Sequence, residues 1–171
     1  MERLRLLLAF VLIFIAGGII FITLGRAASL ITFSSRQEAV MPKTFDQMVT
    51  EALNEVPAIS PEEAYQKTQT DPNTLVVDVR VPADIVVTGI IPGAVNVTLG
   101  TLTYKADHEV PTEWRDPNFQ DYSRPIITTC ETGEMAALAG KLLKDMGYTK
   151  VRILKGGTVA WRDAGYQTIE Q

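Results

Sequence analysis

The chain has 171 residues, of which 46% are hydrophobic, and a formal net charge of −4 at pH 7. This length allows one domain of ordinary size and one additional segment. An acidic chain without a basic stripe argues against a nucleic-acid partner. One cysteine and one histidine, with no glycine-rich phosphate loop, match none of the usual metal or nucleotide patterns, so we expect no metal and no cofactor.

The first 26 residues are predicted to be a transmembrane anchor. Residues 6–24 carry no charge, Arg3 and Arg5 precede them, and Arg26 follows them. A run of this length is able to cross a bilayer as a helix. A cleavable signal peptide is the alternative, although the run exceeds a usual signal core. Because a short head on a first hydrophobic segment usually stays in the cytoplasm, we expect a single-pass membrane protein with an extracytoplasmic domain, periplasmic in a bacterium.

Residues 27–57 are predicted to be a linker that contains one short helix. Thr44 and Gln47 have the spacing of a capping box, and apolar side chains recur on one helix face as far as Leu53. We expect this helix to pack on the domain or on the membrane surface. A helix that binds a protein partner is the less favoured interpretation.

Residues 58–171 form the predicted domain, which begins with a helix and a buried strand. Ser60, Pro61 and Glu63 predict a helix start, and we expect the helix to cover about residues 61–68. Residues 74–79 are an almost unbroken apolar run, as in a strand covered on both faces. Polar residues near the C-terminal ends of such strands often face a ligand. Here they are Asp78 and Arg80, for which an ion pair between neighbouring loops is an equal alternative.

Cys130, the only cysteine, is predicted to lie at a strand-to-helix turn. Residues 126–129 have the pattern of a buried strand, and apolar residues from Met135 to Met146 share one helix face. The first amides of a helix lack internal partners and carry the positive end of its dipole. Such a loop would stabilise a thiolate, which is the nucleophilic form of cysteine, and a persulfide beyond it. A buried structural cysteine is the alternative.

The last part of the domain repeats the alternation of strand and helix. A strand is predicted at residues 150–154, a tight passage at Gly156-Gly157, and a helix around residues 159–163 that contains Trp161 as a core side chain. Another short strand is expected at residues 95–97. This alternation predicts an α/β fold with a mainly parallel sheet.

Four motifs within residues 58–168 resemble those of the single-domain rhodaneses, a sulfurtransferase family. In chain order they are Asp78-Val79-Arg80, Gly89 to Val97, Cys130-x-x-Gly133, and Gly156-Gly157 with Trp161. The resemblance implies a three-layer α/β fold with a mainly parallel five-stranded central sheet flanked by helices, here preceded by one transmembrane helix. It also implies that Cys130 is catalytic and that Asp78 gives structural support. The implied substrate-binding residues are Arg80 and the loop residues Glu131, Thr132, Gly133, Glu134, Met135 and Ala136.

The loop departs from the family pattern in its charges. Rhodaneses often carry an arginine near the end of the loop, and cysteine phosphatases of this general fold have one at the position of Ala136, so phosphatase chemistry is not expected. Glu131 and Glu134 add two carboxylates, each opposing a thiolate by roughly 0.6 to 1.2 kcal/mol at about 7 Å. We therefore expect weak activity with thiosulfate.

The sequence favours a membrane-anchored sulfurtransferase that moves sulfane sulfur through a persulfide on Cys130 to a thiol or cyanide. Its expected donor is a small sulfur compound or a protein-borne persulfide. The alternatives are a non-catalytic rhodanese-like module that tethers a protein partner, and a thiol redox sensor. His108, the only histidine, is interpreted as a loop residue rather than a base for Cys130.

Overall fold

The structure, a computed structural model, describes residues 11–15, 18–22 and 41–170. Residues near the N-terminus form two antiparallel strands, β1 (Val11–Ile15) and β2 (Gly18–Ile22). This corrects the helix predicted over residues 6–24 wherever that run is described. More than half of the residues in the two strands are valine or isoleucine, whose branched Cβ favours extended backbone. Across the described ranges, no helix is both long and apolar enough to span a membrane.

The remaining N-terminal residues, 1–10, 16–17 and 23–40, lie outside the described part of the chain. The flanking arginines and the alternative signal cleavage site fall within them. A second compact unit begins at Pro42 and contains all further elements.

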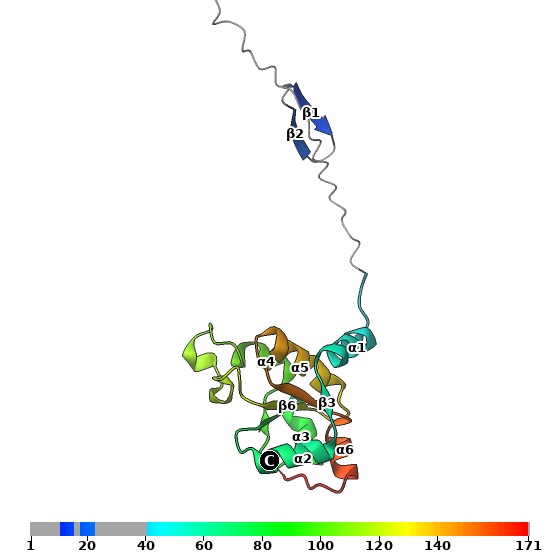
Figure 1. The fold of residues 1–171 in the computed structure, drawn as a ribbon, viewed down its shortest axis with the longest axis vertical. Helices are drawn as coiled ribbons and strands as arrows, with labels where there is room; N and C mark the ends of the chain where they lie inside the picture. The colour runs from blue at the N-terminus through cyan, green and yellow to red at the C-terminus, as the bar shows by residue number, and fades with distance from the viewer. Residues whose placement is uncertain (1–10, 16–17, 23–40, 171) are drawn as a thin grey trace, which may run out of the picture. The chain divides into compact units, whose positions relative to one another are not determined.

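A parallel five-stranded sheet forms the centre of this unit, which confirms the predicted α/β fold (Figure 1). The strands lie in the order β3-β7-β6-β4-β5, and every neighbouring pair is parallel. All residues of the central strands β4 and β6 are buried, as expected when both faces are covered. The bounds are β3 (Ala58–Ile59), β4 (Leu75–Asp78), β5 (Val95–Asn96), β6 (Ile126–Thr129) and β7 (Val151–Leu154).

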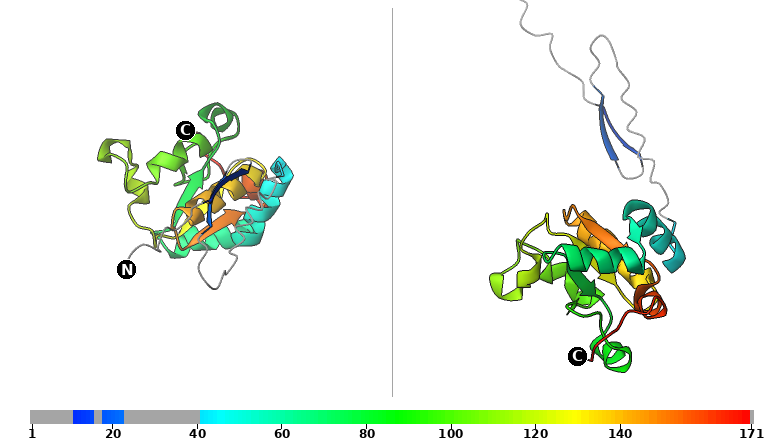
Figure 2. Two further views of the ribbon diagram at one scale, coloured as in Figure 1. Left: turned by 90° about the horizontal axis from the view of Figure 1, so that it is seen from above. Right: turned by 60° about the horizontal axis from the view of Figure 1, so that its bottom comes forward.

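Helices cover both faces of the sheet and complete the three layers (Figures 1 and 2). On one face, α1 (Phe45–Glu55), α4 (Leu99–Lys105) and α5 (Glu134–Asp145) pack over the side chains of Leu75 and Val77. On the other face, α2 (Pro61–Thr70) and α6 (Gly157–Asp163) pack over Val76. Alternate side chains of β4 therefore pack into two separate hydrophobic cores, because successive side chains of a strand point to opposite faces. The remaining helical segments are α3 (Pro82–Thr88), η1 (Thr112–Trp114) and η2 (Pro117–Phe119).

The predicted helix starts of α1 and α2 are confirmed by complete capping boxes. The Thr44 hydroxyl accepts the backbone N–H of Gln47, and the Gln47 side chain accepts the N–H of Thr44. Ser60 and Glu63 make the same pair of hydrogen bonds at α2. α1 packs on α5, so this helix belongs to the same compact unit as the sheet.

Tyr148, just after the C-terminal end of α5, is hydrogen-bonded to the long segment that connects β5 and β6. Its buried hydroxyl lies 2.9 Å from the carbonyl oxygen of Ala106 and 2.7 Å from that of Phe119. Burial raises the pKa of Tyr148 well above its usual value, so the hydroxyl keeps its proton as a donor. His108 bonds the same Phe119 carbonyl and stacks on Tyr122. This end of the domain is separated from the N-terminus of α5 by the length of that helix, roughly 18 Å.

Candidate active site

Cys130 lies between the end of β6 and the start of α5, and its sulfur faces backbone N–H groups. The amides of Gly133 and Ala136 donate hydrogen bonds to Sγ at 3.1 and 3.4 Å. Cys130 is 3% exposed, so only a small group is able to reach the sulfur. These two N–H groups are placed to donate hydrogen bonds to negative charge that develops on the sulfur during a reaction.

Gly133 makes the turn that aims these amides. Its φ of +111° lies in the left-handed region that side chains disfavour, and it stands at the N-cap of α5. A Cβ at this position would approach the backbone nitrogen of Gly156 to 3.2 Å. The glycine at the fourth loop position is therefore required by backbone conformation and by the close approach of the chain leading into α6.

The start of α6 holds the outer side of the loop formed by residues 130–136, which we call the cysteine loop. The N–H of Thr158 donates to the carbonyl of Cys130 at 2.8 Å, and that of Val159 donates to the carbonyl of Glu131 at 3.0 Å. In a trans peptide the C=O and the following N–H point in opposite directions, so the amides of residues 131 and 132 face away from α6. A Cβ on Gly157 would lie 2.4 Å from the Cys130 carbonyl oxygen, which explains the second glycine of the Gly-Gly pair.

Arg80 is buried at the end of β4, and all five of its N–H donors are paired within the protein. Nε and Nη2 contact the carboxylate of Asp78, and Nη2 also donates to the Gly89 carbonyl at 2.8 Å. Nη1 donates to the hydroxyl of Thr88 and to Glu131, both at 2.6 Å. Burial lowers the pKa of Arg80, but the pairing with Asp78 and Glu131 outweighs it and raises the pKa overall. Asp78 and Arg80 thus join neighbouring loops, the alternative that the sequence left open.

Glu131 bridges two arginines, one of which sequence reasoning missed. Its Oε1 accepts Arg162 Nη2 at 2.6 Å, while its Oε2 accepts Arg80 Nη1 and the Thr158 hydroxyl. Burial alone would raise the pKa of Glu131, but the hydrogen bonds from Arg162 and Thr158 and the two positive charges hold it below its ordinary value. This changes the repulsion expected from Glu131, because its charge is balanced within the cluster.

The family model of the rhodanese-like domain matches residues 60–164. The chain belongs to the rhodanese-like domain family. Two solved structures are similar along most of this rhodanese-like domain. One is a protein of unknown function and possible tyrosine phosphatase from Rhodopseudomonas palustris, with 31% identity and a TM-score of 0.68 over 75% of this chain and 99% of that one. The other is the polysulfide-sulfur transferase homodimer of Wolinella succinogenes, with 25% identity and a TM-score of 0.58 over 74% of this chain and 88% of that one.

One similar protein from the curated sequences is also named a sulfurtransferase. The sulfurtransferase of Allochromatium vinosum is 28% identical over 107 residues, which are 63% of this chain and 89% of that protein. These comparisons place this chain among rhodanese-like sulfurtransferase homologues.

Apart from Ala136, the other residues of the cysteine loop are more exposed than Cys130. The Glu134 carboxylate accepts the Thr132 hydroxyl at 2.5 Å, and this hydrogen bond lowers the pKa of Glu134. An acidic side chain in the first turn of a helix is also favoured by the dipole. Met135 is 41% exposed, whereas Ala136 is buried beneath the sulfur. The structure brings Cys130 and the amides of Gly133 and Ala136 together, and leaves Glu134 at the surface.

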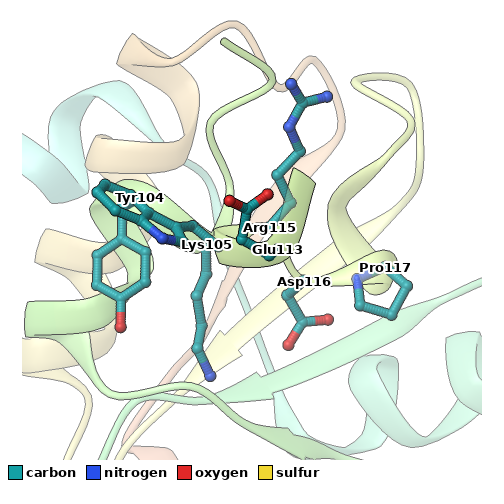
Figure 3. Close-up of a pocket in the computed structure, with 7 residues that line it drawn as sticks. Tyr104, Lys105, Glu113, Arg115, Asp116 and Pro117 are labelled. Atoms are coloured by element: carbon teal, nitrogen blue, oxygen red, sulfur yellow. The ribbon is translucent and has the colours of Figure 1, made fainter. Parts of the chain in front are cut away.

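One pocket lies away from the cysteine loop. It encloses about 660 Å³ and is lined by Tyr104 and Lys105 at the end of α4 and by residues 113–117 (Figure 3). The last turn of α4 leads directly to Ala106, which Tyr148 bonds beyond the far end of α5. His108 lies there too, so the only histidine of the chain is not placed to act as a base for Cys130.

Proposed function

We propose that this rhodanese-like protein is a sulfurtransferase that carries sulfane sulfur as a persulfide on Cys130. The observation that carries the proposal is the pair of amide hydrogen bonds that Sγ receives from Gly133 and Ala136. A thiolate and the terminal sulfur of a persulfide are both anions. Both are stabilised by N–H groups at a helix N-terminus, and α5 supplies that terminus.

The reaction has two displacement steps at sulfur. The Cys130 thiolate attacks the outer sulfur of the donor, a new S–S bond forms, and the donor's own S–S bond breaks as the leaving group departs with the electron pair. Cyanide or an acceptor thiolate then attacks the outer sulfur of the persulfide and releases the Cys130 thiolate. Because Cys130 is almost fully buried, the donor has to present its transferable sulfur at an end of the molecule.

The loop supports sulfur transfer better than phosphate-ester hydrolysis. One similar structure is described as a possible tyrosine phosphatase and another as a polysulfide-sulfur transferase. A phosphoryl group carries three charged oxygens that an arginine grips in two places. Here Ala136 stands at the position of that arginine, and the Arg80 donors are all paired. A donor that ends in a single sulfur needs no such grip.

Intact-mass spectrometry of the full-length protein tests this proposal. After incubation with polysulfide, we expect a gain of one sulfur, about 32 Da by atomic mass, which cyanide then removes. The variant Cys130→Ser should show no adduct. If the wild-type protein gains no sulfur although iodoacetamide still alkylates Cys130, the enzyme proposal fails and the protein-tethering module becomes the better interpretation.

We also propose that residues 6–24 attach the protein to a membrane and leave the rhodanese-like domain on the extracytoplasmic side. The uncharged run itself supports the attachment, and the five-residue head that precedes it supports the orientation. Carbonate extraction of cell membranes should leave the full chain in the pellet and release a chain that lacks residues 1–26. Recovery of both proteins in the supernatant would contradict the proposal.

A further inference from the structure

We propose that Glu131 is a specificity-determining residue: its ion pairs with two guanidinium groups prevent those groups from binding the sulfur donor. By engaging Arg80 and Arg162, Glu131 disfavours donors whose leaving group is an oxyanion, such as thiosulfate. It leaves the site to persulfides of uncharged thiols and to persulfides carried on proteins. This inference rests on the sulfurtransferase function proposed above, and it assigns the donor class of the same site.

The first support is the position of Glu131. It directly follows Cys130, and its carbonyl is held by Val159 at the start of α6. Each carboxylate oxygen contacts a different arginine at 2.6 Å. One side chain next to the reactive sulfur thus engages a cation from the end of β4 and a cation from α6.

The second support is that the Arg162 guanidinium has hydrogen-bond donors that no group in the described part of the chain accepts. Its side chain is 32% exposed, against 3% for Arg80, and the Glu131 side chain that it contacts is 36% exposed. Nη2 is bound to Glu131, whereas Nη1 is buried and has no hydrogen-bond partner within the described structure. A guanidinium that is freed from Glu131 and turns outward would offer both nitrogens of one edge to an oxyanion, which is the geometry that such groups bind best.

The third support is the balance of charge. Asp78 and Glu131 carry two negative charges, and Arg80 and Arg162 carry two positive ones, so the cluster is neutral as a whole. Glu134 adds an unbalanced carboxylate to the same loop. A dianion such as thiosulfate therefore meets no net positive charge at the loop.

The test compares two donors on the full-length protein. The rates of persulfide formation on Cys130 are measured by intact mass with thiosulfate and with the persulfide of N-acetylcysteamine. We call the second compound the uncharged donor because its thiol part carries no charge, so that it has one negative charge fewer than thiosulfate even when its outer sulfur is ionised. Removing the Glu131 charge leaves one positive charge of the cluster unbalanced, and we take roughly 8 to 10 Å as its working distance from the donor in the Coulomb estimate. At an effective dielectric constant of 40 to 80, the Glu131→Gln variant should raise the ratio of thiosulfate rate to uncharged-donor rate by about 2- to 6-fold, because the two donors differ by one charge.

Two matched variants separate release of the arginines from a simple change in charge. Glu134→Gln removes a carboxylate from the same loop but frees no guanidinium. Because this carboxylate is exposed to water, its ratio should rise by at most about threefold. Glu113→Gln removes an exposed carboxylate at the far end of the domain, and its ratio should equal that of the wild type. An equal gain in Glu131→Gln and Glu134→Gln, or no gain in Glu131→Gln, would overturn the inference.

Thermal unfolding and loading by the uncharged donor show whether Glu131→Gln is folded. If it is not, Glu131→Asp provides the test, because its shorter side chain keeps the charge but does not reach both arginines. Its ratio should rise at least about twofold, the smallest net effect of one hydrogen bond from a released guanidinium to the oxyanion, and an unchanged ratio would refute the inference. If neither donor loads the wild-type protein, the sulfurtransferase function fails. If the uncharged donor loads it but the ratios of the variants do not differ, only the role of Glu131 fails.

Discussion

Replacing Gly157 with alanine should displace the cysteine loop, because α6 approaches that loop too closely for a side chain. The added Cβ would lie 2.4 Å from the carbonyl oxygen of Cys130 and 2.6 Å from that of Glu131. Contacts this short with backbone atoms require one segment to move. The φ of +58° at Gly157 adds the cost of a left-handed conformation for a residue with a side chain.

The loss of stability follows from these contacts. The left-handed backbone costs roughly 1 to 2 kcal/mol. Separation of the two segments weakens the hydrogen bonds from Thr158 and Val159 to the loop carbonyls, at about 0.5 to 1.5 kcal/mol each. Gly157→Ala should therefore lower the free energy of unfolding by about 2 to 5 kcal/mol. It should also slow persulfide formation, because the carbonyls that fix the amide directions are no longer held.

Gly165→Ala is the matched control, since Gly165 also has a positive φ, +86°, but has open space around its Cβ position. Urea denaturation of both variants isolates the effect of the close approach as the difference between them. Gly165→Ala should show only the backbone cost and keep wild-type persulfide loading. If Gly157→Ala is no less stable than Gly165→Ala, or loads sulfur as fast, α6 does not hold the loop as described.

Three further predictions concern buried contacts and pH. Asp78→Asn should destabilise the domain by about 3 to 5 kcal/mol in urea denaturation, because the buried Arg80 guanidinium loses the negative charge of its main partner. Lys43→Ala is the control: it breaks the exposed ion pair with Glu51 and should have little effect. Tyr148→Phe should cost about 1 to 2 kcal/mol through its lost contacts with two carbonyls, and a change in its sulfur loading rate would argue against the separation of the two ends of the domain. The folded-state pKa of Glu131 lies below its ordinary 4.5, so its stabilising contribution is present above that pH and is lost as the pH falls through the lowered value. Glu131→Gln should flatten the acid branch of the stability profile measured by thermal unfolding, and an unchanged acid branch would show that this carboxyl is not paired as described.

Local patterns predicted the domain well because its signals are short in range. The strand at residues 126–129 and the helix starts at Thr44 and Ser60 depend on neighbours within a few positions, and the structure confirms them. The loop glycine is of the same kind, since the need for positive φ at Gly133 arises within one turn. The membrane helix is the exception. Hydropathy ranks β-branched and unbranched apolar residues alike, and residues 11–15 and 18–22 form strands.

The sequence by itself determined the alternation of strands and helices that predicts a mainly parallel sheet, and the place of Cys130 before α5, but it did not predict β3, α3 or α4. It left open whether Asp78 and Arg80 face a ligand or each other, and it contained no signal that Arg162 belongs to the site. Arg162 is 31 positions from Glu131, and only the packing of α6 against the cysteine loop brings their charges to 2.6 Å. The net charge around the cysteine loop depends on side chains from distant parts of the sequence that come together only when the chain folds. Tertiary structure alone therefore decided that Glu131 is paired with two arginines instead of facing the sulfur as a free carboxylate.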